Sequence, residues 1–366
     1  MGLPVDLDTR PILVFWETTR ACGLACRHCR ASAIAEPLPG ELTTHEAVDF
    51  LETLTGFGLP RPVLVATGGD VLMRHDLNVI AEEAAADRMP LALAPSVTPL
   101  LTDERIEALR RHGLKIASIS LDGARAATHD SVRGVPGHFE QTLEAILMLR
   151  RHGITVQVNT LVMNESVEEL PAIARLVRDS GAGIWELFFL IPMGRGTTLA
   201  GLTPEENEEV CHFLVDASRY GFVVRTVEAP FFRRVVAERA SGGSPPRRAL
   251  YAQLSAGLHS ELGEPDGQVR AQTKGTRDGR GIIFVGHDGE VTPSGFLPYS
   301  LGNVRSDNIV ELYRDHPLLR SIRAAEFSGR CGVCAFRDRC GGSRARAFAM
   351  TGDPLGEDPA CPFEAN

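Results

Sequence analysis

From residue 12 to about residue 228, the sequence alternates short apolar runs, several rich in β-branched residues, with longer segments of helical periodicity. Continuous apolar runs of this length are typical of strands buried in a parallel sheet. The runs cover residues 12–17, 63–67, 91–95, 115–121, 154–162 and 184–191. Six β/α units are too few for a complete eight-stranded barrel and predict an open, partial one, with its chemistry at the carboxyl ends of the strands. The fold class is therefore α/β, a partial (β/α)6 TIM-like barrel, and a doubly wound open sheet is the alternative.

Local signals mark where the intervening helices begin and end. Thr43 and Glu46 form a capping box, and Thr102 precedes an acidic first turn in a similar way. Two helix ends, in LRRHGLKIASIS and LRRHGITVQVNT, carry basic residues followed by Gly113 or Gly153 at the C′ position. This repetition supports a recurring β/α unit.

The repeat fades after residue 228. Two segments rich in Gly, Pro or charge, 241–246 and 263–280, predict connections around a helix at 247–262. GIIFVGHDGEVTPSG predicts a β-hairpin that turns at Asp288 and Gly289. The remainder is short and rich in Cys and Gly, so a bound metal cluster is its expected stabiliser. We predict a barrel at 1–228, a linking segment at 229–280 and a small cysteine-rich iron–sulfur domain at 281–366.

Charge and hydropathy exclude two classes of partner. A formal net charge of -9 gives no sign of the clustered cations that a phosphate backbone requires, so nucleic acid is not expected. No apolar run reaches the roughly 18–20 residues of a membrane span, and the N-terminus lacks the layout of a signal peptide. We expect a cytoplasmic protein without a membrane partner. In that reducing compartment, eight cysteines favour metal or redox chemistry over disulfides.

Three cysteines, Cys22, Cys26 and Cys29, follow the first predicted strand with a C-x3-C-x2-C spacing. A structural zinc site normally has four protein ligands, and none completes this set nearby unless His28 serves. A 4Fe-4S cluster has four irons, so three thiolates leave one iron open to a substrate or cofactor. The spacing favours such a catalytic cluster, with structural zinc and ordinary thiols as the alternatives.

The stretch CGLACRHC, with aromatic His28 before the third cysteine, resembles the signature of the radical SAM family. The resemblance implies that the three cysteines hold a 4Fe-4S cluster whose fourth iron is chelated by S-adenosylmethionine (SAM). One electron would then cleave SAM to methionine and a 5'-deoxyadenosyl radical, which abstracts hydrogen from the substrate. His28 is one of the expected cofactor-binding residues.

A stretch after the second predicted strand extends the resemblance. ATGGDVL is similar to the Gly-Gly-Glu-Pro stretch of that family, which assigns Gly68, Gly69 and Asp70 to the methionine amino group of SAM. The sequence departs from the pattern, because Asp70 is a shorter acid and Val71 replaces the usual proline. A plain strand-to-helix turn is the alternative interpretation.

Four further residues lie in or after the fourth and fifth predicted strands. By the same resemblance, Ser120 and Asp122 in SISLDG belong to the region that contacts the ribose and carboxylate. Arg133 in HDSVRG would bind the methionine carboxylate, which suits a guanidinium fork, and VQVNTLV supplies Asn159. Each residue also has a simpler interpretation as a helix cap or a solvated charge.

Near the C-terminus, Cys331, Cys334, Cys340 and Cys361 have a C-x2-C-x5-C-x20-C spacing, and a zinc site with four cysteine ligands is one interpretation. The segment resembles the SPASM or twitch extension of radical SAM enzymes, which holds auxiliary 4Fe-4S clusters. That resemblance and four cysteines predict one fully ligated auxiliary cluster. The remaining cysteine, Cys211, is interpreted as a small buried hydrophobe.

The resemblance covers nearly the whole chain and implies an enzyme that cleaves SAM reductively and abstracts hydrogen from its substrate. FWETTRACGLACRHCRA and GFLPYSLGNVR are most similar to the branch of alternative haem and haem d1 synthesis, which implies modification of tetrapyrrole side chains. A maturase of a ribosomally made peptide is the competing enzyme hypothesis, and an electron carrier or zinc scaffold is the non-catalytic one. The implied cofactors are two 4Fe-4S clusters and SAM, with flavodoxin or ferredoxin as electron donor.

Overall fold

The computed structural model describes residues 6–272 and 275–364, and its named strands form one sheet. The strands are β1 (Leu13–Glu17), β2 (Val63–Thr67), β3 (Leu91–Leu93), β4 (Leu114–Ser120), β5 (Thr155–Val162), β6 (Ile184–Phe189), β7 (Val223–Val227), β8 (Ile282–Val285), β9 (Glu290–Thr292) and β10 (Gly302–Asn303). Their order is β10-β9-β8-β1-β2-β3-β4-β5-β6-β7, and neighbours are parallel from β8 through β7. β1 to β6 confirm the six predicted strands, and the sheet continues beyond them through β7 and β8.

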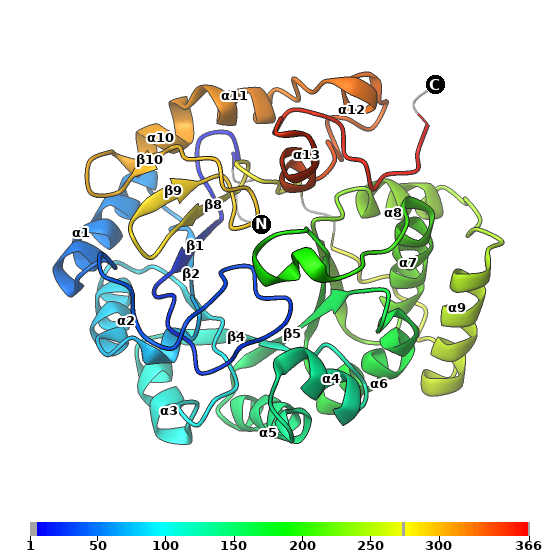
Figure 1. Ribbon diagram of the computed structural model, residues 1–366, viewed down its shortest axis with the longest axis horizontal. Coiled ribbons are helices and arrows are strands. Elements are labelled where there is room, and N and C mark those ends of the chain that lie inside the picture. Colours follow the sequence, from blue (N-terminus) through cyan, green and yellow to red (C-terminus); the bar gives the residue numbers. More distant parts are fainter. Residues whose placement is uncertain (1–5, 273–274, 365–366) are drawn as a thin grey trace.

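The order of the strands distinguishes the two predicted architectures. A doubly wound sheet reverses its strand order at a switch point. Here β1 to β7 follow one another without reversal. Figure 1 shows helices forming a ring outside these strands. The α/β partial barrel is therefore confirmed, and its parallel strands present their carboxyl ends at one mouth.

Two helix starts and two helix ends lie where the sequence signals predicted them. Thr43 and Thr102 cap α1 and α3, and Gly113 and Gly153 follow α3 and α5 with φ values of +93° and +72°. The α-helices are α1 (Thr44–Leu54), α2 (Leu77–Ala86), α3 (Asp103–Arg111), α4 (Ala126–Arg133), α5 (His138–Arg151), α6 (Leu170–Ser180), α7 (Pro204–Ala217), α8 (Phe232–Ala240), α9 (Ala249–Leu262), α10 (Ile309–Asp315), α11 (Pro317–Arg323), α12 (Gly329–Val333) and α13 (Arg344–Thr351). The 3-10 turns are η1 (Thr55–Phe57), η2 (Val71–Met73), η3 (Val167–Glu169) and η4 (Gly194–Thr198).

Alternation along the strands separates the core from the barrel interior. In β5, Val156 and Val158 are buried in the main hydrophobic core, and Gln157 and Asn159 face the opposite side of the sheet. Each large apolar side chain that is fully buried in this way contributes about 1.5–3 kcal/mol. Cys211 of α7 is also fully buried in this core, which confirms its predicted role.

The C-terminal segment is joined to the barrel sheet. β8 and β9 form the predicted hairpin around Asp288 and Gly289, and β8 pairs in parallel with β1. The Tyr313 hydroxyl accepts a hydrogen bond from Gly281 N at 2.7 Å and donates to Leu7 O at 2.6 Å.

α9 confirms the helix predicted at 247–262. In the described ranges, no helix combines the length and apolar character that crossing a membrane requires.

Candidate functional site

The loop between β1 and α1 carries the first three cysteines and lies over the middle of the ring of strands (Figure 1). Cys22 and Cys26 are buried and Cys29 is partly exposed. Each sulfur has a donor beside it: Leu24 N is 3.3 Å from Cys22 Sγ, Arg133 Nη1 is 3.7 Å from Cys26 Sγ, and Ala33 N is 3.4 Å from Cys29 Sγ. Donors that face a sulfur stabilise its thiolate, so the three positions suit metal-bound cysteines.

The turn after β2 packs tightly against this loop. Gly69 N donates to Thr19 O and Asp70 N donates to Ala21 O, both at 2.7 Å. A Cβ on Gly69 would lie 2.3 Å from Ala21 O, and one on Gly68 would lie 2.7 Å from Thr19 O. Because only glycine permits so close an approach, Gly68 and Gly69 keep the turn beside the cysteine loop.

The Asp70 carboxylate is used inside the fold. It is fully buried and accepts hydrogen bonds from Leu72 N at 3.1 Å, Ser96 N at 3.3 Å and Thr98 Oγ1 at 2.8 Å. Burial raises the pKa of Asp70 despite these donors. Ser96 Oγ also lies 3.5 Å from Cys22 Sγ. Ser96 and Thr98 are not among the predicted site residues, although their place after β3 was an available signal.

Asp122 brings three predicted site residues together. Its Oδ2 lies 2.9 Å from His28 Nε2 and forms an ion pair with Arg133, and its Oδ1 accepts from Leu161 N at 2.9 Å. The side chain is buried, which alone would raise the pKa of Asp122. Arg133 and His28 outweigh burial and hold that pKa well below its usual value. The result is a buried anion with a cation that also touches Cys26.

Two buried histidines support the Asp122 loop from behind. Asp122 N donates to His129 Nδ1 at 3.2 Å, so His129 carries its proton on Nε2, 2.9 Å from His138 Nδ1. His138 Nε2 donates to Val97 O at 3.0 Å. Burial, with Arg133 nearby, lowers the pKa of His129 to about 3. This neutral chain connects the loops that follow β3 and β4.

A polar row crosses the inner face of the sheet. Ser120 pairs in register with Asn159, Asn159 with Glu186, and Glu186 with Arg225. Gln157 Nε2 donates to Asn159 Oδ1 and to Glu186 Oε2, both at 2.8 Å. Burial raises the pKa of Glu186. The structure thus places the predicted Ser120 and Asn159 in one row with Glu186 and Arg225, which the sequence analysis missed.

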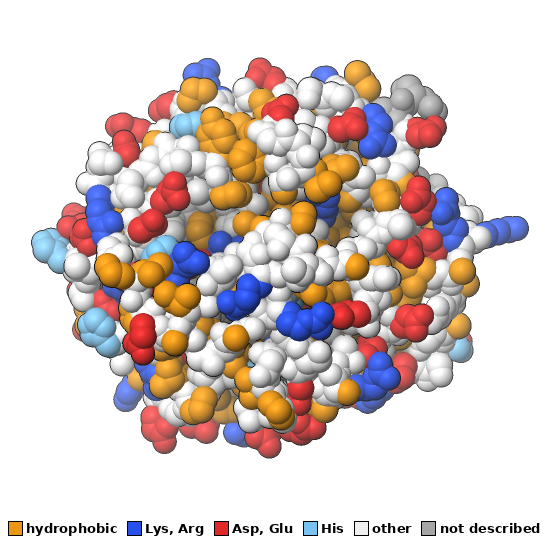
Figure 2. Space-filling view, in the orientation of Figure 1, with side chains coloured by type: hydrophobic (Ala, Val, Ile, Leu, Met, Phe, Trp, Pro, Cys, Tyr) orange, Lys and Arg blue, Asp and Glu red, His pale blue; other side chains and the backbone are white. Residues whose placement is uncertain are grey.

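A second charged group lies at the carboxyl end of β1. Glu17 forms an ion pair with Arg30 and lies 3.2 Å from His287 Nδ1. Burial alone would raise the pKa of Glu17, but His287 and Arg30 outweigh it. Arg30 Cζ lies 4.9 Å from the Phe284 ring centroid. Figure 2 shows basic side chains near the middle of the face that carries the mouth.

The η4 turn after β6 packs against the cysteine loop and donates hydrogen bonds to its backbone. Arg195 Nε donates to Cys26 O at 2.8 Å and its Nη1 donates to Ala33 O at 2.9 Å. Gly194 has a φ of +54°, and a Cβ there would lie 2.3 Å from Arg30 O. Sequence reasoning missed this contact because GRGTT has no signature and its partner is distant in the chain.

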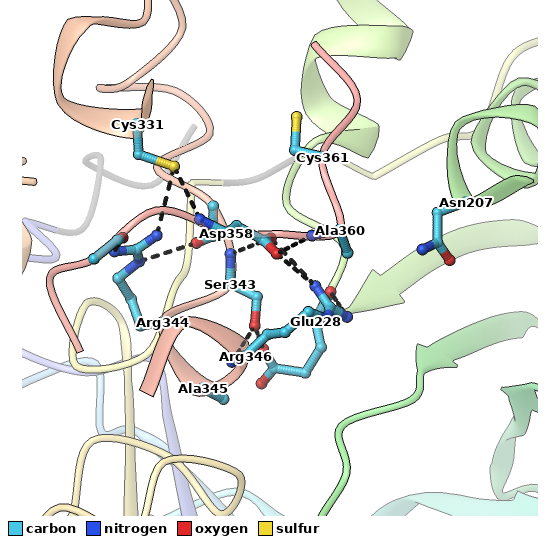
Figure 3. Close-up of polar contacts among 12 residues, drawn as sticks. Asn207, Glu228, Cys331, Ser343, Arg344, Ala345, Arg346, Asp358, Ala360 and Cys361 are labelled. Carbon is cyan, nitrogen blue, oxygen red and sulfur yellow. Dashed lines mark hydrogen bonds and ion pairs between the residues drawn. The ribbon is translucent and has the colours of Figure 1, made fainter. Parts of the chain in front are cut away.

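The four C-terminal cysteines line one cavity. Cys331 Sγ accepts from Asp358 N at 3.4 Å and from Arg344 Nη2 at 3.7 Å (Figure 3). Burial raises the pKa of Cys340 to about 12 and that of Cys361 to about 11, so a metal must displace their protons on binding. Phe336 N donates to Cys334 Sγ at 3.4 Å. The C-terminal cysteine site therefore places four cysteine side chains around one shared cavity.

A buried network joins these cysteines to the end of β7 (Figure 3). Asp358 accepts from Ser343 N at 2.7 Å and forms an ion pair with Arg346 at 3.0 Å. Ser343 Oγ donates to the carboxylate of Glu228, which follows β7 with a φ of +59°. The C-terminal cysteine segment is therefore anchored to the barrel through α13.

The two sets of cysteines, the first three and the last four, fit iron–sulfur clusters by their donor chemistry. Cysteine thiolates are the usual ligands of such clusters, and hydrogen bonds to the sulfurs tune them. Each of the first three sulfurs has a donor, and the last four surround a cavity. Within the described residues, no group of three or more His, Cys, Asp or Glu side chains is arranged to hold a single metal ion.

Known proteins resemble this chain in sequence and in fold. Residues 16–177 match the sequence profile of the Radical SAM superfamily. Over its full length the chain is 36% identical to an AdoMet-dependent heme synthase of Oleidesulfovibrio alaskensis, of which it covers 91%. It is 28% identical to the mycofactocin maturase MftC of Mycobacterium tuberculosis, over 96% of this chain and 83% of that protein. The crystal structure of Streptococcus suis SuiB bound to precursor peptide SuiA has a TM-score of 0.70 at 13% identity, over 97% of this chain and 76% of that one. The SuiB comparison shows a shared fold.

Proposed function

Because the chain belongs to the radical SAM superfamily, whose enzymes use SAM and a 4Fe-4S cluster, we propose that it modifies the side chains of a tetrapyrrole. The observation that carries this proposal is the 36% identity to a haem synthase along the whole chain. Identity to the peptide maturase is lower, at 28%. Residues at the mouth of the barrel would bind the cofactor and orient such a substrate.

The residues around the first three cysteines would hold the cluster and SAM. Arg133 Nε is buried and has no hydrogen-bond partner among the described residues, which fits the carboxylate of a bound amino acid. Asp70 would act indirectly, by fixing the turn beside the cysteine loop, because the fold uses both its carboxylate and its backbone N–H. When bound, the cluster and SAM supply a 5'-deoxyadenosyl radical that removes one hydrogen atom from the substrate. The proposed set is Cys22, Cys26 and Cys29 for the cluster, with His28, Gly68, Gly69, Asp70, Ser120, Asp122, Arg133 and Asn159 for SAM.

Basic side chains at the mouth would orient the substrate. Tetrapyrrole side chains include carboxylates, which pair well with guanidinium groups. Arg30 and His287 lie at the end of β1, and Arg225 lies in the polar row, where its Nε donates to Gln272 Oε1 at 2.6 Å. A substrate carboxylate bound among them would place its methylene groups inside the barrel, away from water.

The C-terminal cysteines would hold an auxiliary 4Fe-4S cluster. The proposed modification is the conversion of a propionate side chain to a vinyl group. This conversion releases one CO2, one hydrogen atom and one electron, so the enzyme needs an electron acceptor. Cys331, Cys334, Cys340 and Cys361 would provide four ligands and leave no iron open. A flavodoxin or ferredoxin would reduce the first cluster, and a reducing cytosol suits the eight free cysteines.

The test uses the reconstituted full-length enzyme with SAM, a reductant and iron coproporphyrin III, which carries propionates where haem carries vinyl groups. We expect each converted side chain, counted as the neutral acid, to lose one CO2 and two hydrogens, one of which is the carboxyl proton, with one 5'-deoxyadenosine formed per conversion. The Cys22→Ala variant should give neither product. Formation of 5'-deoxyadenosine without any change in the mass of the tetrapyrrole would contradict the substrate and leave the superfamily chemistry intact.

A peptide maturase is the second candidate, because 96% of the chain aligns with MftC at 28% identity. The same assay separates the two functions when a precursor peptide replaces the tetrapyrrole. A change in the mass of the peptide, with none in the tetrapyrrole, would favour the maturase.

A further inference from the structure

Three arginines beside the C-terminal cysteines make hydrogen bonds to neutral carbonyl groups. Arg233 donates to Arg339 O at 3.2 Å and to Thr276 O, and Arg277 donates to Asp338 O. Arg344 donates to Pro354 O at 3.2 Å and Gly356 O at 2.6 Å. Within the described part of the chain, none of the three guanidinium groups has a carboxylate oxygen within 4.0 Å of its nitrogens. Arg277 and Arg344 are buried, at 6% and 0% exposure.

Two of these guanidinium groups lie directly against the cysteine segment. Arg344 Nη2 is 3.7 Å from Cys331 Sγ, a contact drawn in Figure 3. Arg277 packs on Gly341, which follows Cys340, so closely that a Cβ there would lie 2.6 Å from Arg277 Nη1. Both guanidinium groups lie near the Phe327 ring, with Cζ at 5.7 Å for Arg277 and 4.4 Å for Arg344.

A buried cation without an anion is strongly unfavourable, so this group of charges needs a counter-charge. Arg277 Nε and Nη1 have no hydrogen-bond partner among the described residues. Burial and Arg233 lower the pKa of Arg277 to about 10, which leaves it charged at neutral pH. Asp358 is paired with Arg346, and among the described residues no carboxylate forms an ion pair with Arg233, Arg277 or Arg344.

We propose that Arg277, with Arg233 and Arg344, sets the reduction potential of the cluster held by the four C-terminal cysteines, by stabilising its reduced form. The inference rests on the auxiliary cluster of the proposed function. Reduction adds a negative charge to the cluster, and fixed cations in a region of low dielectric favour the more negative state. The arginines would therefore act on the cluster through their positive charge and not as its ligands. They make the auxiliary cluster a better acceptor for the electron that a decarboxylated side chain releases.

The experiment measures the midpoint potential of the auxiliary cluster by EPR-monitored redox titration. It uses the full chain with Cys22, Cys26 and Cys29 replaced by alanine, so that only the auxiliary cluster contributes a signal. Arg277→Gln should shift the ratio of reduced to oxidised cluster at least tenfold toward the oxidised form. For a one-electron couple, this is a midpoint lower by about 59 mV. Arg277→Lys keeps the charge and should retain the parent midpoint.

Arg337→Gln is the matched control. Arg337 lines the same cavity, but its side chain is 52% exposed and near Asp338, so solvent screens its charge. This variant should change the ratio less than twofold. If Arg277→Gln does not assemble the cluster, the less buried Arg233→Gln carries the same test in the same direction.

The outcomes separate this inference from the proposed function. No iron and no EPR signal in the parent would overturn the auxiliary cluster and the inference together. An assembled cluster whose midpoint is the same in the parent and in Arg277→Gln would overturn the inference alone. An equal shift in Arg277→Lys and Arg277→Gln would also overturn it, because packing rather than charge would then set the potential.

Discussion

Asp122 shows how one residue can organise a site without contact from solvent. Its carboxylate accepts from a backbone amide, faces a histidine and pairs with an arginine, and all three partners come from different segments. Removing one partner of a buried ion pair typically costs about 3–5 kcal/mol, because the other charge stays buried. The position of Arg133 beside Cys26 therefore depends on Asp122.

The neighbouring His129 makes stability depend on pH. Its pKa falls from the usual 6.5 to about 3 in the folded chain, so only the unfolded chain binds the proton in this interval. The contribution of this histidine to stability is therefore complete above pH 6.5 and is lost as the pH falls toward 3. Between about pH 7 and about pH 5, we expect it to account for a loss of about 2 kcal/mol in the free energy of unfolding.

Urea unfolding of the wild type and of His129→Gln at these two pH values checks this expectation. The variant should lose that part of the pH dependence, because glutamine does not titrate. The exposed His75 provides the control, and His75→Gln should keep the wild-type dependence. The same dependence in His129→Gln and the wild type would assign it to another group.

At the scale of elements, the η4 turn and the cysteine loop behave as one packed unit. Gly194→Ala would place a methyl group 2.3 Å from Arg30 O at a φ of +54°. We expect a loss of about 3 kcal/mol in stability, and faster removal of iron from the first cluster by a chelator. Thermal unfolding and the rate of iron release measure the two effects.

Gly153→Ala is the matched control for this prediction. Gly153 has a similar φ of +72°, but a Cβ there would meet nothing within 4 Å. It should cost only about 1 kcal/mol and leave iron release unchanged. Equal effects of the two substitutions would mean that backbone strain, and not contact with the cysteine loop, explains the result.

At the scale of the whole molecule, the two proposed clusters should be separable. Cys334→Ala should remove about half of the iron and abolish turnover of the tetrapyrrole, while cleavage of SAM to 5'-deoxyadenosine continues. The physical reason is that the first three cysteines pack together in the loop at the barrel mouth, whereas the last four line a separate cavity. Iron content, circular dichroism and product formation are compared in one preparation.

Cys211→Ala is the control, because Cys211 is a core residue of α7 that lines neither site. Its iron content and turnover should match the wild type. Normal tetrapyrrole turnover in Cys334→Ala would refute an essential auxiliary cluster.

Local signals explain how much of this molecule could be predicted. The first six strands, the caps at Thr43 and Thr102 and the C-terminal hairpin depend on residues close together in the chain, and all were predicted correctly. Residues such as Ser96, His287 and Arg195 meet the cysteine loop or β1 only after the barrel closes, and no local pattern marks such contacts. β8 was predicted as a strand, but its pairing with β1 depends on a contact across most of the chain.

That pairing has a consequence for biosynthesis. β1 lies between β2 and β8, with Leu13 opposite both Val63 and Ile282. During translation, one edge of β1 stays open until residue 282 leaves the ribosome, tens of seconds after the cysteine loop at typical elongation rates. An open parallel edge can pair with other chains, so the nascent protein passes through an aggregation-prone interval. The strand that leads into the cysteine loop is thus covered on its second edge only after most of the chain has been made.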